Sequence, residues 1–188
     1  MKAINWEEIS EGSGGFSDIP SGGYVCKVVE VVDEEDYSNN WGDTYDRIVI
    51  RYDIAEGPEA DFFARNNKPD FTHEHEFRYN PTNCGEKFTW SVEQFKRFWN
   101  TVLPESNPGW TWDLNPASLK GLKFGATLRH RYYTKGDGDD GSQIQVQGLY
   151  GAQAIREGKF TAPKDIDKRE KPAPAPAPHP AYSDDLPF

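Results

Sequence analysis

The sequence predicts a mainly β domain of five strands, with one helix between the third and fourth strands and a tail after the domain. Residues 45–54 alternate between apolar and polar side chains, and residues 24–32 form a β-branched run. Both patterns are typical of strands. Aromatic and aliphatic side chains recur at helical spacing between residues 95 and 102. Residues 172–180 carry proline at every second position, which is typical of an extended polyproline-II tether.

The five expected strands are separated by segments rich in Gly, Asp, Asn or Pro, which interrupt regular structure. Residues 33–43 are acidic and polar, and we expect a loop there from which Trp41 projects. Residues 135–142 are rich in Gly and Asp, and we expect a long hairpin connection. The expected strands are residues 24–32, 45–54, 73–79, 122–134 and 143–149.

The expected helix begins at Ser91, because Ser91 and Gln94 have the spacing of a capping box. Pro104 follows the last apolar residue of the helical pattern. Since proline cannot continue a helix, the helix is expected to end before Pro104. We expect its aromatic side chains to belong to the core or to cover one end of the domain.

The length of 188 residues suits one domain with a tail rather than two full domains. No apolar run follows a basic segment at the start, and no stretch approaches the ~20 apolar residues of a membrane span. Cys26 and Cys84 lie far apart, so we expect reduced thiols in a cytosolic protein. The predicted parts are an N-terminal arm at residues 1–19, a folded domain at 20–160, a disordered Pro-rich linker at 161–182 and an acidic tip at 183–188.

The last residues of the chain form a compact recognition element. Asp184, Asp185, Leu186 and Pro187 precede the terminal Phe188. Phe188 offers an aromatic ring and the α-carboxylate, which suit an apolar pocket rimmed by Arg or Lys. Proline restricts the backbone before binding, and the two aspartates steer the tip toward a basic surface. These five residues are therefore predicted to bind a partner protein.

This tip resembles the C-terminal tip of bacterial single-stranded DNA-binding proteins, with Leu186 where that family has isoleucine and Ser183 where it usually has another acid. In that family the tip recruits nucleases, helicases, primase and repair factors, and an oligonucleotide-binding (OB) domain holds the DNA. Five strands with a helix between the third and fourth is also the order of an OB-fold barrel. The resemblance therefore implies an OB-fold protein of phage or prophage type, acting in replication or recombination in the cytoplasm of a bacterial host cell.

The net charge of −10 does not favour binding to nucleic acid, but the charge is unevenly distributed. Residues 1–46 hold two basic and eleven acidic residues, whereas residues 119–135 hold five basic residues and no acid. Non-specific binding of a single strand needs cations along the phosphates and flat rings that stack on bases. The predicted DNA-binding residues are Trp41, Arg47, Arg51, Tyr79, Arg129, Arg131, Tyr133 and Lys135.

Structural roles compete with each of these assignments. Most aromatic residues of a barrel this size are core, and we expect Tyr52 and Tyr132 to be buried because they share a face with aliphatic residues. Arg and Lys on strands also protect sheet edges from pairing with other chains. The sequence predicts DNA contact more firmly for the basic group as a whole than for any one residue.

No motif of the sequence predicts an enzyme, a metal or a cofactor. His73, His75 and Cys84 lack a fourth ligand at a suitable spacing for zinc. The loop that begins at Asp137 fails as a calcium loop, because its twelfth position is Gly148 rather than glutamate.

Two alternatives to DNA binding stay open. One is an adaptor whose acidic domain binds proteins, and the other is a magnesium-dependent nuclease. The expected partners are single-stranded DNA and replication or recombination proteins, without a membrane. A homo-oligomer also stays open, because proteins of this type occur as monomers, dimers and tetramers.

Overall fold

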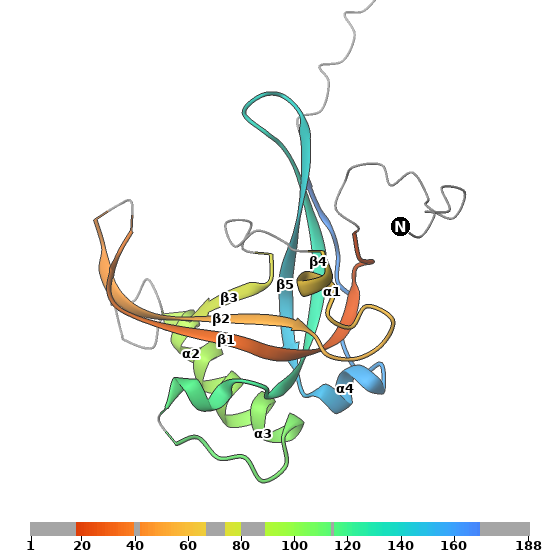
Figure 1. Cartoon of the computed structure of the whole chain (residues 1–188). Coiled ribbons are helices and arrows are strands. Elements are labelled where there is room, and N and C mark those ends of the chain that lie inside the picture. The colour runs from red at the N-terminus through yellow and green to blue at the C-terminus, as the bar shows by residue number, and fades with distance from the viewer. Residues whose placement is uncertain (1–17, 40–41, 67–73, 80–88, 114, 170–188) are drawn as a thin grey trace, which may run out of the picture.

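The computed structural model describes residues 18–39, 42–66, 74–79, 89–113 and 115–169. Six strands form one sheet in the order β3-β2-β1-β4-β5, with β6 beside β4 (Figure 1). The paired strands are antiparallel except for β4 and β6, which run parallel. The strands are β1 (Gly22–Ser38), β2 (Thr44–Ile54), β3 (Glu76–Tyr79), β4 (Lys123–Thr134), β5 (Asp140–Tyr150) and β6 (Ile166–Lys168).

The first hairpin is longer than the sequence predicts. β1 continues to Ser38, so residues 33–38, which were expected to be loop, are strand. Cross-strand contacts explain the extension, because Tyr37 and Tyr45 lie opposite each other with ring centroids 5.6 Å apart. Pairs of this kind stabilise a hairpin even where the sequence is polar. The β1–β2 and β4–β5 hairpins extend away from the helices in different directions (Figure 1).

A continuous helical run joins β3 to β4. It consists of α2 (Thr89–Arg97), the π-helix η3 (Phe98–Val102) and α3 (Leu103–Ser106). The run begins two residues before Ser91 and continues through Pro104, so the prediction that the helix ends before Pro104 is wrong. Pro104 lies in α3, directly after the π-helix η3, so the last turn of the run includes a proline although its nitrogen has no N–H to donate. The other helices are α1 (Phe62–Arg65), the 3-10 helix η4 (Pro116–Leu119) and α4 (Ala152–Arg156).

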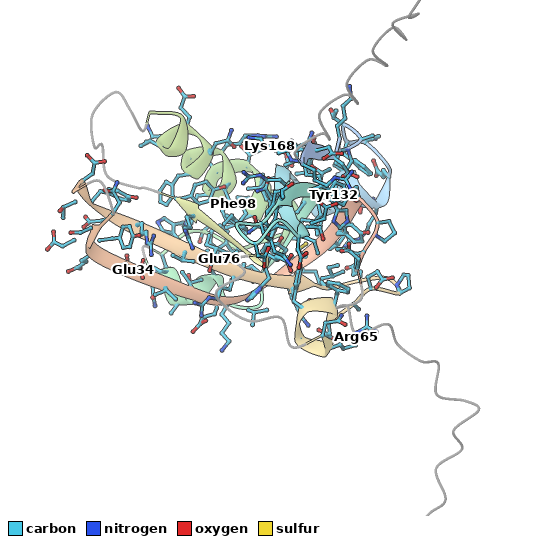
Figure 2. The ribbon with its side chains drawn as sticks, turned by 90° about the horizontal axis from the view of Figure 1, so that it is seen from above. Glu34, Arg65, Glu76, Phe98, Tyr132 and Lys168 are labelled. Atoms are coloured by element: carbon cyan, nitrogen blue, oxygen red, sulfur yellow. The ribbon has the colours of Figure 1, made fainter. Side chains whose placement is uncertain are left out.

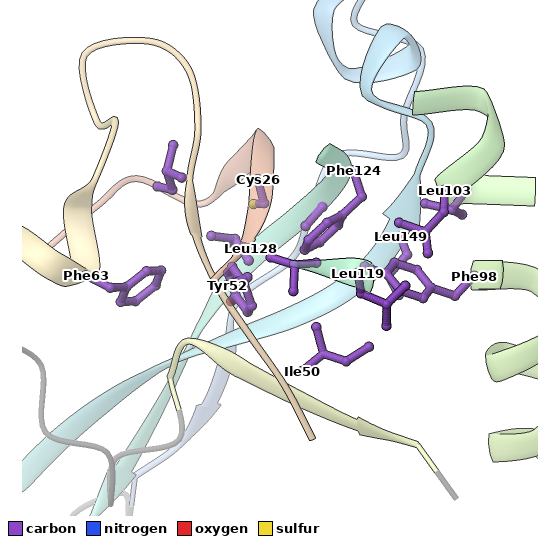
Figure 3. Packing of buried hydrophobic residues seen from close by; sticks show 14 of the residues in the cluster. Cys26, Ile50, Tyr52, Phe63, Phe98, Leu103, Leu119, Phe124, Leu128 and Leu149 are labelled. Atoms are coloured by element: carbon purple, nitrogen blue, oxygen red, sulfur yellow. The ribbon is translucent and has the colours of Figure 1, made fainter. Parts of the chain in front are cut away.

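The core lies between the inner face of the sheet and the helices (Figure 3). Tyr52 is 1% exposed, which confirms the prediction that it is buried. Its ring contacts Phe63 and Phe124 edge-on, with centroids 5.6 and 5.9 Å apart. Phe98 of η3 packs on Phe124 in the same way at 5.5 Å. Rings from the sheet and from two helices thus hold the elements together.

The described strands form an open sheet rather than the predicted closed barrel. β3 and β5 end the strand path, and no ladder joins them within the described part of the chain. Instead, the Glu74 carboxylate spans the gap, because its Oε1 accepts a hydrogen bond from the Ile144 N–H of β5 at 3.2 Å. The Tyr52 hydroxyl donates to the Glu74 carbonyl at 3.0 Å. A side chain therefore satisfies an edge N–H that strand pairing would satisfy in a closed barrel.

The predicted linker contains a strand. β1 pairs with β4 only as far as Leu128, and β6 pairs with Arg131 to Tyr133 farther along the same edge. β6 therefore occupies an edge that β1 leaves open, and residues 161–169 belong to the folded part of the chain. The rest of the predicted linker, the tip and residues 1–17 lie outside the described residues.

Candidate nucleic-acid interface

The predicted cations of β2 lie on the outer face of strands β1, β2 and β3, opposite carboxylates. Arg47 pairs in register with Glu34 and makes an ion pair with it. Its guanidinium carbon also lies 3.2 Å from the centroid of the Tyr37 ring, and the side chain is 14% exposed. The hydrogen bond from Arg47 lowers the pKa of Glu34. Glu34 therefore neutralises the charge of Arg47, and the side chain lies against the outer face of the sheet.

Arg51 is neutralised in the same way. Its Nη1 lies 2.6 Å from Glu30 Oε2, and its Nε lies 3.6 Å from Glu76 Oε2. Glu76 is 4% exposed and also binds Arg78. The group formed by these residues has three positive and three negative charges and no net charge. We call it the paired face: Glu30, Glu34, Arg47, Arg51, Glu76 and Arg78.

The predicted cations of β4 have different neighbours. Arg129, Arg131 and Tyr133 alternate onto one side of the strand, as successive odd positions must. The residues opposite them on β5 are Gln145, Gln143 and Gly141, none of which carries a charge. We call this surface the arm face: Arg129, Arg131, Tyr133, Gln143 and Gln145.

The two arginines of the arm face are not neutralised. Within the described residues, neither Arg129 nor Arg131 forms an ion pair, and the Nε atom of each is buried without a hydrogen-bond partner. Asp165 is near enough for Arg129 to contribute to its lowered pKa, but the larger causes are hydrogen bonds from Ser21 and the His130 N–H. Both side chains are half-buried, and no described carboxylate forms an ion pair with either guanidinium, so this surface can attract an external anion.

Tyr133 lies beside these cations because its cross-strand neighbour is glycine. A Cβ atom at Gly141 would lie 2.9 Å from Cζ of the Tyr133 ring, closer than real contacts allow. The ring therefore lies against the backbone of β5, and its side chain is half-buried. A flat ring next to two arginines is the combination that binds unstacked bases and phosphates.

Lys135 is exposed in the turn that joins β4 to β5. Its N–H donates to the Asp139 carbonyl at 2.8 Å, and Asp137 accepts a hydrogen bond from the Asp139 N–H at 3.1 Å. Lys135 therefore belongs to a turn that also carries carboxylates, which reduces its contribution to a positive surface.

Tyr79 does not belong to this site. It pairs with Ile48 on the inner side of the sheet and is 5% exposed. Its ring lies among Phe95, Phe98 and Trp99, with centroids 5.8 to 6.0 Å away. Burial raises the pKa of its hydroxyl. The prediction that Tyr79 stacks on DNA conflicts with this position, because inner-face residues of β3 enter the core.

The remaining predicted residues are not placed by the structure. Trp41 and the tip residues Asp184, Asp185, Leu186, Pro187 and Phe188 lie outside the described residues. One neighbour of the arm face was not predicted from the sequence. Lys168 of β6 pairs in register with Tyr133, and a strand of three residues is too short for periodicity to identify.

His130 links β4 to the first residues that the structure describes. Its Nε2 lies 2.6 Å from the Ile19 carbonyl, and its Nδ1 lies 3.6 Å from Asp18 Oδ2. The ring stacks on Tyr132 with centroids 5.8 Å apart. Tyr132 is half-buried, so it is less enclosed than the sequence predicts. These contacts lie on the side of β4 opposite the arm face.

The described residues contain no cluster of three or more His, Cys, Asp or Glu side chains able to hold a metal ion. Of the three residues considered for zinc, His75 is described, whereas His73 and Cys84 lie outside the described residues. No helix in the described ranges has the length and apolar character that crossing a bilayer requires. No protein-family model and no curated protein matches this sequence.

Proposed function

We propose that this chain binds single-stranded DNA without sequence preference, and that its C-terminal tip recruits replication or recombination proteins. One observation carries the DNA-binding part. On the arm face, two arginines that form no ion pair with any described residue precede a tyrosine on the same side of β4, and no carboxylate lies opposite them on β5. Cations would follow the phosphates and the ring would take an unstacked base, a contact worth ~1–3 kcal/mol per base.

The strand order supports an OB-type architecture for this function. β1 pairs with both β2 and β4, and the helical run lies between β3 and β4, as in the five-stranded Greek-key OB barrel. In that fold the loop between the fourth and fifth strands borders the nucleic-acid groove. The arm face lies directly next to the corresponding turn, at Lys135. The open seam between β3 and β5 is compatible with a barrel that is only partly closed.

The tip and the tether supply the second half of the proposal. The tether from residue 170 to the tip would hold recruited enzymes near the bound strand and raise their local concentration. The tip is itself anionic and would compete with DNA for the arm face. Deletion of Asp184 to Phe188 is therefore expected to tighten DNA binding, most clearly at low salt. Weaker binding after the deletion would contradict this competition.

The experiment that tests the proposal is a titration of a fluorescent oligo-dT strand with the full chain at low salt, followed by anisotropy. We expect saturable binding that weakens steeply as salt is raised, because bound counterions are released. No binding at low salt would contradict the proposal and favour the adaptor, for which the net charge of −10 is the supporting observation. Incubation of the same strand with Mg²⁺ tests the nuclease alternative, and we expect the strand to stay intact.

A further inference from the structure

The strand β6 lies beside the arm face, at the point where the tail leaves the described domain. Ile166 pairs with Arg131, Asp167 with Tyr132, and Lys168 with Tyr133. Residues in register on neighbouring strands share a side of the sheet, and successive residues alternate between the two sides. Lys168 therefore lies on the same side as Tyr133, whereas Asp167 lies on the opposite side.

The acidic residues of this region gather on that opposite side. Asp167 Oδ2 lies 2.6 Å from Nη2 of Arg169, and Asp140 Oδ2 lies 3.7 Å from Nη1 of the same guanidinium. The Arg169 guanidinium carbon lies 5.2 Å from the centroid of the Tyr132 ring. Both carboxylates therefore lie on the side away from the arm face, where they neutralise the charge of Arg169.

Contacts at both ends hold β6 in place. At the start, the Asp165 carboxylate accepts a hydrogen bond from the His130 N–H at 2.9 Å and another from the Ser21 hydroxyl. At the end, Arg169 binds Asp167 and covers Tyr132. Lys168 lies between these two anchors. Its backbone position is therefore defined by its neighbours rather than by any contact of its own side chain.

The Lys168 ammonium is available for an external anion. Lys168 is exposed, and it forms no ion pair with any residue that the structure describes. Figure 2 shows Lys168 and Tyr132 together in one part of the sheet, away from Glu34 of the paired face. Lys168 therefore adds a third cation to the two arginines of the arm face, next to the ring of Tyr133.

We propose that Lys168 is a further DNA-binding residue, which contacts a phosphate of a single strand that passes over β4 and β6 beside Tyr133. This inference rests on the proposed function and adds a contact from a different strand, which the sequence analysis placed in the linker. The bound strand then passes close to residue 169, the last residue that the structure describes. A lysine on an edge strand also serves to prevent sheet-to-sheet association, and the experiment has to separate this role from DNA binding.

The test compares two lysine variants of the full chain, Lys168→Gln and Lys96→Gln. Lys96 is exposed, lies on α2 and forms no ion pair with any described residue. Both variants lose one charge and keep a polar side chain. Binding of fluorescent oligo-dT is measured by anisotropy over a series of salt concentrations, and circular dichroism verifies the fold.

We expect Lys168→Gln to weaken binding about five-fold at 0.1 M salt and to reduce the slope of log K against log[salt] by about 0.7, the value for one lost phosphate contact with a single strand. Lys96→Gln is expected to stay within about two-fold of the wild type. Lys168→Arg keeps the charge, so it is expected to bind as the wild type does.

Equal effects of Lys168→Gln and Lys96→Gln, with binding by the wild type intact, would overturn the assignment of Lys168 and leave the proposed function standing. Equal losses in Lys168→Arg and Lys168→Gln would likewise contradict a role for the charge. Absence of binding by the wild type would contradict the proposed function itself, and the Lys168 contact with it.

Discussion

The paired face and the arm face carry the same kind of cation in opposite electrostatic settings. Each has two arginines on the outer side of a long strand. On the paired face the residues opposite these arginines are glutamates of β1, whereas opposite Arg129 and Arg131 they are glutamines of β5. The cross-strand neighbour, rather than the arginine itself, therefore decides whether a strand presents positive charge.

This difference also separates two structural roles. The arginines of the paired face tie β1, β2 and β3 together, because Arg51 reaches both Glu30 and Glu76. The arginines of the arm face form no such links with any residue that the structure describes. We therefore expect the paired face to contribute to stability and the arm face to contribute to binding.

The largest expected effect is on DNA affinity. Arg129→Ala combined with Arg131→Ala is expected to weaken oligo-dT binding about 25-fold at 0.1 M salt and to reduce the salt slope by about 1.4, because two phosphate contacts are lost. The matched control is Arg47→Ala with Arg51→Ala, which removes the same charge from the paired face. Equal losses of affinity in the two double variants, both folded by circular dichroism, would remove the distinction between the faces.

The next largest effect is on stability, and we expect it at the paired face rather than at the arm face. Arg47→Ala leaves Glu34 without its partner and removes the contact with the Tyr37 ring. We expect the free energy of unfolding to fall by about 1–2 kcal/mol, with partial exposure of Glu34 limiting the loss. Arg131→Ala is expected to change it by less than about 0.5 kcal/mol. Urea denaturation measures both, and a larger loss for Arg131→Ala would contradict the assigned roles.

A smaller effect is expected for the ring of the arm face. Tyr133→Leu is expected to weaken oligo-dT binding about five-fold, since one stacked base contributes ~1 kcal/mol or more. Tyr45→Leu is the control, because Tyr45 contacts Tyr37 in the other hairpin. If both variants shift the midpoint of the anisotropy titration equally, Tyr133 does not stack on a base.

The smallest effect is a pH dependence from the paired face. The folded pKa of Glu34 is lowered by Arg47, so the pair stabilises the fold above the ordinary glutamate pKa of about 4.3, and this contribution disappears as the pH falls through the folded pKa. Compared with Glu34→Gln, the wild type is expected to lose roughly 0.5 kcal/mol more between pH 7 and pH 3, a value reduced by solvent screening. Urea denaturation at both pH values tests this, and parallel losses would contradict it.

Local sequence patterns predicted a large part of the fold. The apolar alternation of residues 45–54 and the runs at 122–134 and 143–149 correspond to β2, β4 and β5 with small shifts of their ends. The helix between the third and fourth strands was predicted for the same reason, because its spacing is visible within a few turns. The alternation also predicted that Arg129, Arg131 and Tyr133 share one side of β4, which is the basis of the candidate site.

Other features depend on residues that are far apart along the chain. Tyr79 follows the polar Arg78 and was expected to be on the surface, but pairing with Ile48 directs it into the core. β6 forms because β1 leaves part of the edge of β4 unpaired, which no property of residues 166–168 indicates. The bridge from Glu74 to Ile144 likewise joins segments separated by 70 positions.

The sequence by itself determined most of β2, β4 and β5 and which side of its strand each of their arginines occupies, because these depend on a period of two residues within one segment. Only the tertiary structure decided what lies opposite each arginine. The register of β1 against β2 shifts at two bulges, after Val28 and after Glu34, and each shift exchanges the neighbours of every following residue. Register depends on the turn, the bulges and the buried face together. Whether an arginine lies opposite a glutamate or a glutamine was therefore decided only by the tertiary structure.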